Sequence, residues 1–255
     1  MELFVETQGT GPDLVLVHGW GLHGGVFDTL AAELASRFRV TRVDLPGHGR
    51  SVSCALANDV EVVTAQLSAA LPTPAIWVGW SLGGLIALQR ALSVPDSVRA
   101  LILVATSPRF IIGTDWPHGV DDAVLQQFAR DLDQDYAATL ARFLALQVRG
   151  SAQAGATLRA LRARLLEQGA PTPAALHIGL ELLRTTDLRA QLGGIDCPTH
   201  FVFGERDVLA PASIAEALRV LMPAARSSII CGAGHAPFLS HGAEFIELLE
   251  TFLRD

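Results

Sequence analysis

Short apolar segments alternate with helical ones along most of this chain, and this alternation constrains the fold more than any other feature. Six segments have the apolar, strand-like composition of buried strands: Leu14–His18, Arg39–Asp44, Ala75–Gly79, Ala100–Val104, Thr199–Phe203 and Ser227–Cys231. Helices are expected between the first four, at about residues 26–36, 59–71 and 82–93. The alternation predicts βαβ units and a parallel sheet with helices on both faces. Leu3–Val5 is expected to add an antiparallel edge strand.

The alternation stops after Val104. Four helical patterns then follow one another without a convincing strand: Ala123–Leu132, Tyr136–Val148, Thr157–Leu166 and Ala174–Arg184. An all-helical insertion of this kind predicts a cap over the carboxyl edge of the sheet, where open α/β sheets bind ligands. We therefore expect one catalytic domain, with residues 1–109 and 193–255 as its core and residues 110–192 as the helical cap.

The bulk composition excludes several classes of protein. A chain of 255 residues, half of them hydrophobic, can bury a substantial core, and its formal net charge of −7 argues against a nucleic-acid binder. Its three cysteines show neither pairing nor ligand spacing, which favours a reducing compartment and no metal site. No signal-peptide pattern and no membrane-length apolar run is present. We expect a cytoplasmic monomer that binds neither nucleic acid nor membrane.

The motif Gly79-Trp80-Ser81-Leu82-Gly83 lies between the strand Ala75–Gly79 and a predicted helix. A Gly-x-Ser-x-Gly in this context is typical of a nucleophile elbow, a tight turn that presents the serine hydroxyl outward. Its glycines are needed because side chains at the flanks of such a turn would clash. The helix directs free N–H groups and its dipole at the position where an oxyanion would develop.

The chain supplies a base and an acid for this serine, whose hydroxyl is a poor nucleophile on its own. Asp207 and His235 each come shortly after a predicted strand, so we expect both at the same sheet edge as Ser81. Of the eight histidines, only His235 follows a strand with flanking glycines and also stands in the expected chain order of Ser, acid and His. The alternatives for the acid are Glu205, Asp187 and Asp196. The sequence predicts a triad of Ser81, His235 and Asp207.

Two backbone N–H groups are expected to bind the negatively charged oxygen of a tetrahedral intermediate. One is the N–H of Leu82, directly after the serine. The other is the N–H of Trp20 in His18-Gly19-Trp20-Gly21, which follows the strand Leu14–His18. The run Asp44–Ser51 is interpreted as a structural loop. Because the chain lacks a P-loop, a dinucleotide fingerprint and a metal-ligand set, we expect acyl transfer to water without a cofactor.

With these residues in place, the whole chain resembles the α/β-hydrolase superfamily and, within it, the pimeloyl-acyl-carrier-protein methyl ester esterases of biotin synthesis. The resemblance rests on the stretches Leu16–Leu22, Gly79–Gly84, Ser107–Phe110, Asp115–Pro117, Arg142–Gln147 and Gly234–His241. It implies an α/β-hydrolase fold, with a mostly parallel sheet and a helical cap inserted after the sixth strand. It also implies the triad already derived.

The resemblance further implies a substrate. Such an enzyme would cleave the methyl ester of pimeloyl-acyl-carrier protein, releasing methanol and the free carboxylate. Substrate would be bound by Trp20, Leu82, Phe143, Leu144, Ala145, Leu146 and Gln147, with the last five along an acyl channel under the cap. Trp80, next to Ser81, is expected to direct the site towards that acyl chain.

The cap has the charge that an acidic carrier protein would require. Between Tyr136 and Leu166 the chain has five arginines and no Asp or Glu. A basic surface steers an acidic partner and pairs with its carboxylates. The docking candidates are Arg142, Arg149, Arg159 and Arg162. The chain departs from the expected basic pattern at Ala138 and Gly155, which puts the strength of docking in doubt.

Two other functions remain open from the sequence. The same triad would serve a broad short-chain carboxylesterase, or a hydrolase of thioesters or carbon–carbon bonds, acting on a small free substrate. A ligand-binding receptor on a hydrolase scaffold is disfavoured because all three triad residues are present. A haloalkane dehalogenase is disfavoured because its nucleophile would be an aspartate at the position of Ser81.

Overall fold

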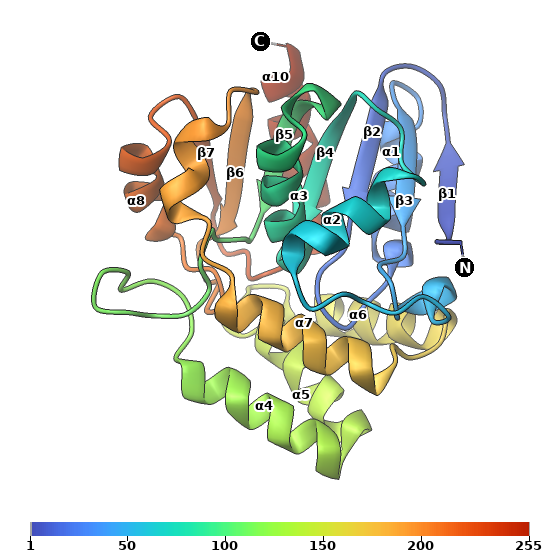
Figure 1. Cartoon of the computed structure of the whole chain (residues 1–255), viewed down its shortest axis with the longest axis vertical. Coiled ribbons are helices and arrows are strands. Elements are labelled where there is room, and N and C mark those ends of the chain that lie inside the picture. Colours follow the sequence, from blue (N-terminus) through green and yellow to red (C-terminus); the bar gives the residue numbers. More distant parts are fainter. Residues whose placement is uncertain (1, 255) are drawn as a thin grey trace.

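Seven strands form one central sheet in the computed structural model, which describes residues 2–254 apart from the side chain of Leu166 (Figure 1). Their spatial order is β1-β3-β2-β4-β5-β6-β7, and only β1 runs antiparallel to its neighbour. The strands are β1 (Val5–Gln8), β2 (Asp13–Val17), β3 (Arg39–Val43), β4 (Ala75–Trp80), β5 (Val98–Val104), β6 (Thr199–Gly204) and β7 (Arg226–Ile230). The predicted parallel sheet is thus confirmed.

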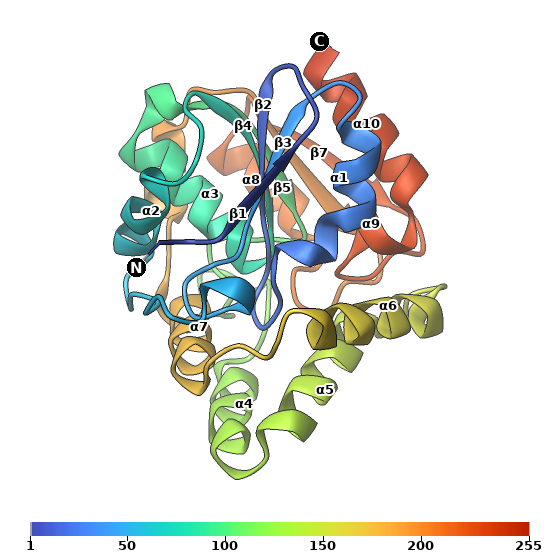
Figure 2. The same ribbon diagram turned by 90° about the vertical axis from the view of Figure 1, so that its right-hand side faces the viewer.

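Helices cover both faces of the sheet (Figure 2). One face carries α2 (Val60–Ser68), α3 (Leu82–Ser93) and α8 (Ile214–Leu221), and the other carries α1 (Asp28–Leu34), the short α9 (Pro237–Ser240) and α10 (Gly242–Arg254). All six residues of β4 are buried. Because a parallel strand sandwiched between two helical layers has no solvent side, its sequence is a continuous apolar run rather than an alternating one.

Two boundaries differ from the sequence predictions. The edge strand pairs antiparallel to β3 as predicted, but it begins at Val5, where the prediction placed its end. Its Thr7 and Gln8 are polar because an edge strand keeps contact with solvent, so an apolar pattern does not extend to them. In place of one helix over about 26–36, a 3-10 turn at Gly24–Phe27 leads into α1.

Four helices form the cap: α4 (Asp122–Gln134), α5 (Tyr136–Gln147), α6 (Ala154–Glu167) and α7 (Pro173–Thr185). They lie together below the sheet in Figure 1, at the edge where its parallel strands end. The cap lies between β5 and β6 in chain order. It therefore follows the fifth strand of the described residues, and not the sixth as expected. The division into core and cap at residues 110 and 192 stays a prediction.

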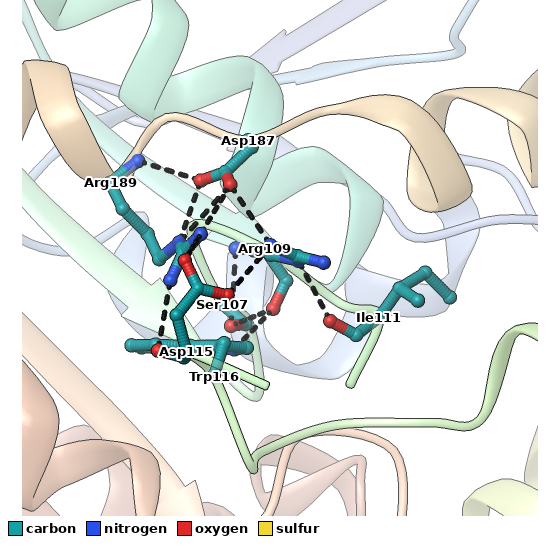
Figure 3. A network of polar contacts seen from close by, with 7 residues as sticks. All are labelled: Ser107, Arg109, Ile111, Asp115, Trp116, Asp187 and Arg189. Carbon is teal, nitrogen blue, oxygen red and sulfur yellow. Dashed lines mark hydrogen bonds and ion pairs between the residues drawn. The ribbon is translucent and has the colours of Figure 1, made fainter. Parts of the chain in front are cut away.

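A network of ion pairs joins the segment that enters the cap to the segment that leaves it (Figure 3). Arg189 binds the carboxylates of Asp115 and Asp187 at 2.9 and 2.7 Å, and Arg109 lies 3.4 Å from both carboxylates. The hydrogen bonds from Arg189 lower the pKa of both carboxyl groups, and those carboxylates raise the pKa of Arg189. Two of the stretches that carry the family resemblance, around Arg109 and Asp115, therefore fasten the base of the cap.

Candidate active site

Ser81 occupies a strained turn between β4 and α3. Its backbone has φ = 54° and ψ = −118°, and the residue is 5% exposed. A Cβ on Gly79 would lie 2.4 Å from the carbonyl oxygen of Gly83, and a Cβ on Gly83 would lie 2.2 Å from that of Val17. Both flanking glycines are thus required by close backbone approach, as the motif predicts. The strain at Ser81 holds its side chain away from the strand.

A Gly83→Ala variant should fold poorly, because the new methyl group would collide with rigid carbonyl oxygens at the end of β2. We expect its free energy of unfolding to fall by about 3 kcal/mol, the upper end of the usual cost of overpacking. Urea denaturation followed by circular dichroism measures this loss. The matched control is Gly155→Ala, whose Cβ would contact only the Nη1 atom of Arg159, at 3.7 Å, and which should change stability by less than about 1 kcal/mol. Equal stability of the two variants would contradict this account of the elbow.

Asp207 and His235 meet at the same edge of the sheet. The Nδ1 atom of His235 lies 2.8 Å from Oδ2 of Asp207, and both side chains are almost fully buried. Oδ1 of Asp207 accepts hydrogen bonds from the N–H groups of Leu209 and Ala210. Because a carboxylate only accepts, Nδ1 carries the proton and Nε2 keeps a free lone pair. Nε2 has no partner among the described residues, so it is available as a base.

The alternative acids lie elsewhere. Glu205 accepts hydrogen bonds from the N–H of Gly232 and the thiol of Cys231. Asp187 belongs to the ion-pair network at the base of the cap. Asp196 is exposed and precedes β6, at the opposite end of that strand from Asp207. Of the four candidate acids, the described contacts place only Asp207 on the histidine.

The two predicted oxyanion donors border Ser81. Leu82 begins α3, and the loop containing Trp20 passes so close that a Cβ on Gly19 would lie 3.2 Å from the Cβ of Ser81. Neither the N–H of Leu82 nor that of Trp20 has an acceptor in the part of the chain that the structure describes. The Trp20 side chain is fixed by a hydrogen bond from Nε1 to the carbonyl oxygen of Leu176 on α7, 2.8 Å away. The geometry therefore suits both for binding a developing negative charge.

His18 holds the Trp20 loop in place, a role that sequence reasoning missed. Its Nδ1 lies 2.8 Å from the carbonyl oxygen of Gly19, and its Nε2 accepts a 2.9 Å hydrogen bond from the N–H of Leu45. Burial lowers the pKa of His18 to about 3, so the ring is neutral and Nδ1 donates. A histidine directly at the end of the strand was the available signal. Its partner in the Asp44–Ser51 loop depends on tertiary contact and could not be seen in the sequence.

The segment from Phe143 to Gln147 is divided by the helical period of α5. Phe143, Leu144 and Gln147 are buried, whereas Ala145 is exposed and Leu146 is half-buried. The ring of Phe143 packs edge-on against Trp20, with centroids 4.4 Å apart. Leu144 belongs to a different hydrophobic cluster from Phe143, the one on the sheet face that carries α1, α9 and α10. The segment as a whole therefore does not line one channel, and Phe143 is the member that reaches the loop beside Ser81.

Trp80 does not point towards an acyl chain, contrary to the expectation. The side chain is fully buried, and its Nε1 donates a 2.7 Å hydrogen bond to the carbonyl oxygen of His235. Its ring packs edge-on against Phe238, at 5.2 Å. Side chains alternate along a strand, so the residue before an outward-facing serine points into one of the packed faces. Trp80 contacts the loop that carries the candidate base.

Residues 2–254 contain no group of three or more His, Cys, Asp or Glu side chains that could hold a metal ion. None of the helices in this range combines the length and the apolar character that a membrane crossing demands.

Known proteins resemble this chain in sequence and in fold. A model of the Alpha/beta hydrolase family matches residues 14–248. A pimeloyl-[acyl-carrier protein] methyl ester esterase of Stenotrophomonas maltophilia (strain K279a) is 47% identical over 251 residues, covering 98% of this chain and 96% of that protein. Proteins of the same name from Xanthomonas oryzae pv. oryzae (strain MAFF 311018) and Nitrosomonas europaea are 46% and 43% identical, with 98% of both chains covered in each comparison.

Solved structures share the fold at low sequence identity. An esterase from Exiguobacterium antarcticum has a TM-score of 0.89 at 23% identity, covering 99% of this chain and 96% of its own. A bromoperoxidase from Bacillus anthracis has a TM-score of 0.90 at 22% identity, with 99% and 95% covered. With a family model over residues 14–248 and relatives of 43–47% identity along nearly their whole length, the chain belongs to the α/β-hydrolase family.

Proposed function

We propose that this protein is a serine carboxylesterase that hydrolyses the methyl ester of pimeloyl-acyl-carrier protein to pimeloyl-acyl-carrier protein and methanol, as a step of biotin synthesis. The observation that carries the proposal is the convergence of Ser81, Asp207 and His235 at one sheet edge, in a chain that matches curated esterases of that name along its whole length. The expected cytoplasmic location and monomeric state stay predictions.

In the acylation step, Nε2 of His235 takes the proton of the Ser81 hydroxyl while the serine oxygen attacks the ester carbonyl. Asp207 keeps the histidine in the tautomer with a free Nε2 and stabilises the imidazolium that forms. The negatively charged carbonyl oxygen is bound by the N–H groups of Leu82 and Trp20. The intermediate collapses when His235 returns the proton to the methoxy oxygen, which releases methanol and leaves an acyl ester on Ser81.

The deacylation step repeats this sequence with water as the nucleophile. His235 takes a proton from the water molecule as its oxygen attacks the acyl ester, and then gives the proton to Ser81. The product is the free carboxylate, still joined to its carrier through the other end of the acyl chain. No cofactor is needed, because both steps move only protons and one acyl group.

A ladder of packed aromatic rings lies between a surface groove of the cap and the loop beside Ser81. Phe143 packs against Trp20 at one side and against Phe128 of α4 at the other, with ring centroids 5.5 Å apart in the second pair. Phe128 lines a groove of about 520 Å³ on the cap, together with Ala145, Leu146, Arg142 and Arg149. An acyl chain bound in this groove would be separated from the loop beside Ser81 by the buried ring of Phe143. This placement gives Ala145 and Leu146 a role at the entrance and not in a buried channel.

The candidate docking arginines differ in how far they are already paired. All four are exposed, but Arg142 binds the carboxylate of Asp131 at 2.6 Å. Arg149, Arg159 and Arg162 have no ion pair within residues 2–254. Arg159 and Arg162 lie on the exposed face of α6, opposite the buried Leu161. We therefore assign docking of an acidic carrier first to these three arginines, with Arg142 as a weaker contributor.

The test compares carrier-bound pimeloyl methyl ester with a free methyl ester of equal acyl length. Replacing Arg149, Arg159 and Arg162 by glutamine should raise the KM for the carrier-bound ester about tenfold, since each exposed pair contributes about 0.5 kcal/mol. The KM for the free ester should not change. The matched control is Arg219→Gln, an exposed arginine on α8 in the core.

Ionic strength provides a second measurement on the same substrates. The kcat/KM of the wild-type protein for the carrier-bound ester should fall as salt is raised from low to about 0.5 M, because salt screens exposed charges. Equal, salt-insensitive rates on both substrates would reject the carrier protein as partner and favour a broad carboxylesterase. Turnover of a thioester or a carbon–carbon bond in preference to both esters would reject the ester specificity itself.

A further inference from the structure

The backbone of His235 is held from two sides. Its N–H donates a 2.9 Å hydrogen bond to the carbonyl oxygen of Gln147, at the end of cap helix α5. Its own carbonyl oxygen accepts the 2.7 Å hydrogen bond from Nε1 of Trp80, on the central strand β4. Both backbone polar groups of His235 are therefore occupied by partners distant in sequence, one from the cap and one from the sheet.

The loop that carries His235 needs such external support. It lies between β7 and α9 and contains Gly232, whose φ is +72°, and Gly234. A glycine-containing loop outside regular secondary structure has more backbone freedom than a strand or a helix. The bond to Asp207 fixes the ring through Nδ1 alone. The direction of Nε2 then depends on how well the backbone of His235 is fixed.

Trp80 is well placed to fix that backbone. It is the last residue of β4, a strand paired on both sides, and its backbone is joined directly to that of Ser81. The indole is fully buried, packs against Phe238 and lies with its centroid 5.8 Å from the ring of His235. The rigid side chain of Trp80 thus connects the strand that ends beside Ser81 to His235, the residue that would deprotonate the serine.

We propose that Trp80 is a positioning residue of the triad: its indole N–H ties the backbone of the catalytic base to the strand that carries the nucleophile. The inference rests on the proposed roles of Ser81 and His235. It assigns the second residue of the Gly-Trp-Ser-Leu-Gly motif to the geometry of the histidine and not to substrate binding. Loss of the N–H should lower kcat and leave KM nearly unchanged, because Trp80 does not contact substrate in this assignment.

The sharpest test removes the N–H and keeps the ring. Replacing Trp80 by 3-benzothienylalanine, in which sulfur stands in place of the indole N–H, should lower the kcat of methyl ester hydrolysis about ten- to hundred-fold, the scale expected when a catalytic group is misplaced by a fraction of an ångström or more. The matched control is the same replacement at Trp77, on the same strand, whose Nε1 is buried without a hydrogen-bond partner. It should change kcat by less than about twofold.

A double variant separates positioning from a general loss of structure. In a His235→Ala background, the residual activity should not fall further when Trp80 is replaced by the isostere or by phenylalanine, because groups that act as one unit are not additive. Full activity of the Trp80 isostere in the wild-type background would overturn the inference, as would an equal loss in both backgrounds or at Trp77. If Ser81→Ala keeps its activity, the proposed function itself fails. If Ser81→Ala is inactive and the isostere is fully active, only the inference on Trp80 fails.

Discussion

An Asp207→Asn variant is expected to hydrolyse methyl esters about 10⁴-fold more slowly than the wild-type protein at neutral pH. The reason lies in the bonds of the carboxylate. Oδ1 accepts from the N–H groups of Leu209 and Ala210, while Oδ2 accepts from Nδ1 of His235. The carbonyl oxygen of an asparagine would keep the two backbone bonds and turn its NH2 group towards the histidine. Nδ1 would then have to accept, Nε2 would carry the proton, and the base would be lost.

Steady-state kinetics on a free methyl ester measures this loss, and thermal unfolding checks that the fold is kept. Ser81→Ala should lose at least as much activity, since it removes the nucleophile. Asp196→Asn is the matched control, because this exposed aspartate precedes β6 whereas Asp207 follows it. An Asp207→Asn variant that kept more than about a tenth of the wild-type kcat would contradict the assignment of Asp207 as the orienting acid.

The positions of Ser81, Asp207 and His235 could be predicted because they depend on local sequence and on topology. Each follows a strand of a parallel sheet, and the carboxyl ends of such strands meet at one edge. The close approach of Gly83 to the carbonyl oxygen of Val17, which leaves no room for a Cβ, is also implied by the motif, because its flanking glycines are needed where a side chain would clash.

Side-chain directions were harder to predict than positions along the chain. Ala145 was assigned with its neighbours because the resemblance covers a continuous stretch, yet a helix presents only every third or fourth residue on one face. Trp80 was assigned to the substrate because it adjoins Ser81, although a strand sends adjacent side chains to opposite faces. In both cases the periodicity of the helix or strand already places the side chain on a different face from those of its neighbours.

The contacts that join distant loops could not be predicted. The hydrogen bond from Leu45 to His18 spans 27 residues, and the bond from Trp80 to His235 spans 155. In each bond one partner is a backbone group, the N–H of Leu45 or the carbonyl oxygen of His235. Neither residue type nor spacing marks such a group, because a backbone N–H or carbonyl oxygen is present at almost every position. These bonds depend on how the loops at the carboxyl edge pack against each other, which is a property of the folded chain.

The same loops are expected to make the protein sensitive to acid. His18 and His48 are fully buried neighbours, with ring centroids 5.3 Å apart, and burial lowers their pKa values to about 3 and about 4 from the ordinary 6.5. Below pH 6.5 the unfolded chain binds a proton on each ring, whereas the folded chain stays neutral there until much lower pH. Their contribution to stability is therefore complete above pH 6.5 and falls as the pH decreases towards 4.

Each histidine should contribute a slope of about 1.4 kcal/mol per pH unit in this range, so the free energy of unfolding should fall by several kcal/mol between pH 6.5 and 4.5. Urea denaturation at a series of pH values measures the slope. A His48→Gln variant should show a slope shallower by about 1.4 kcal/mol per unit, because its unfolded chain has one imidazole fewer to protonate. Identical slopes for the wild-type protein and His48→Gln would mean that His48 is protonated in the folded state. The proximity of His18 to Gly19 also links this transition to function, because the loop that acid would disrupt is the one that presents the N–H of Trp20 beside Ser81.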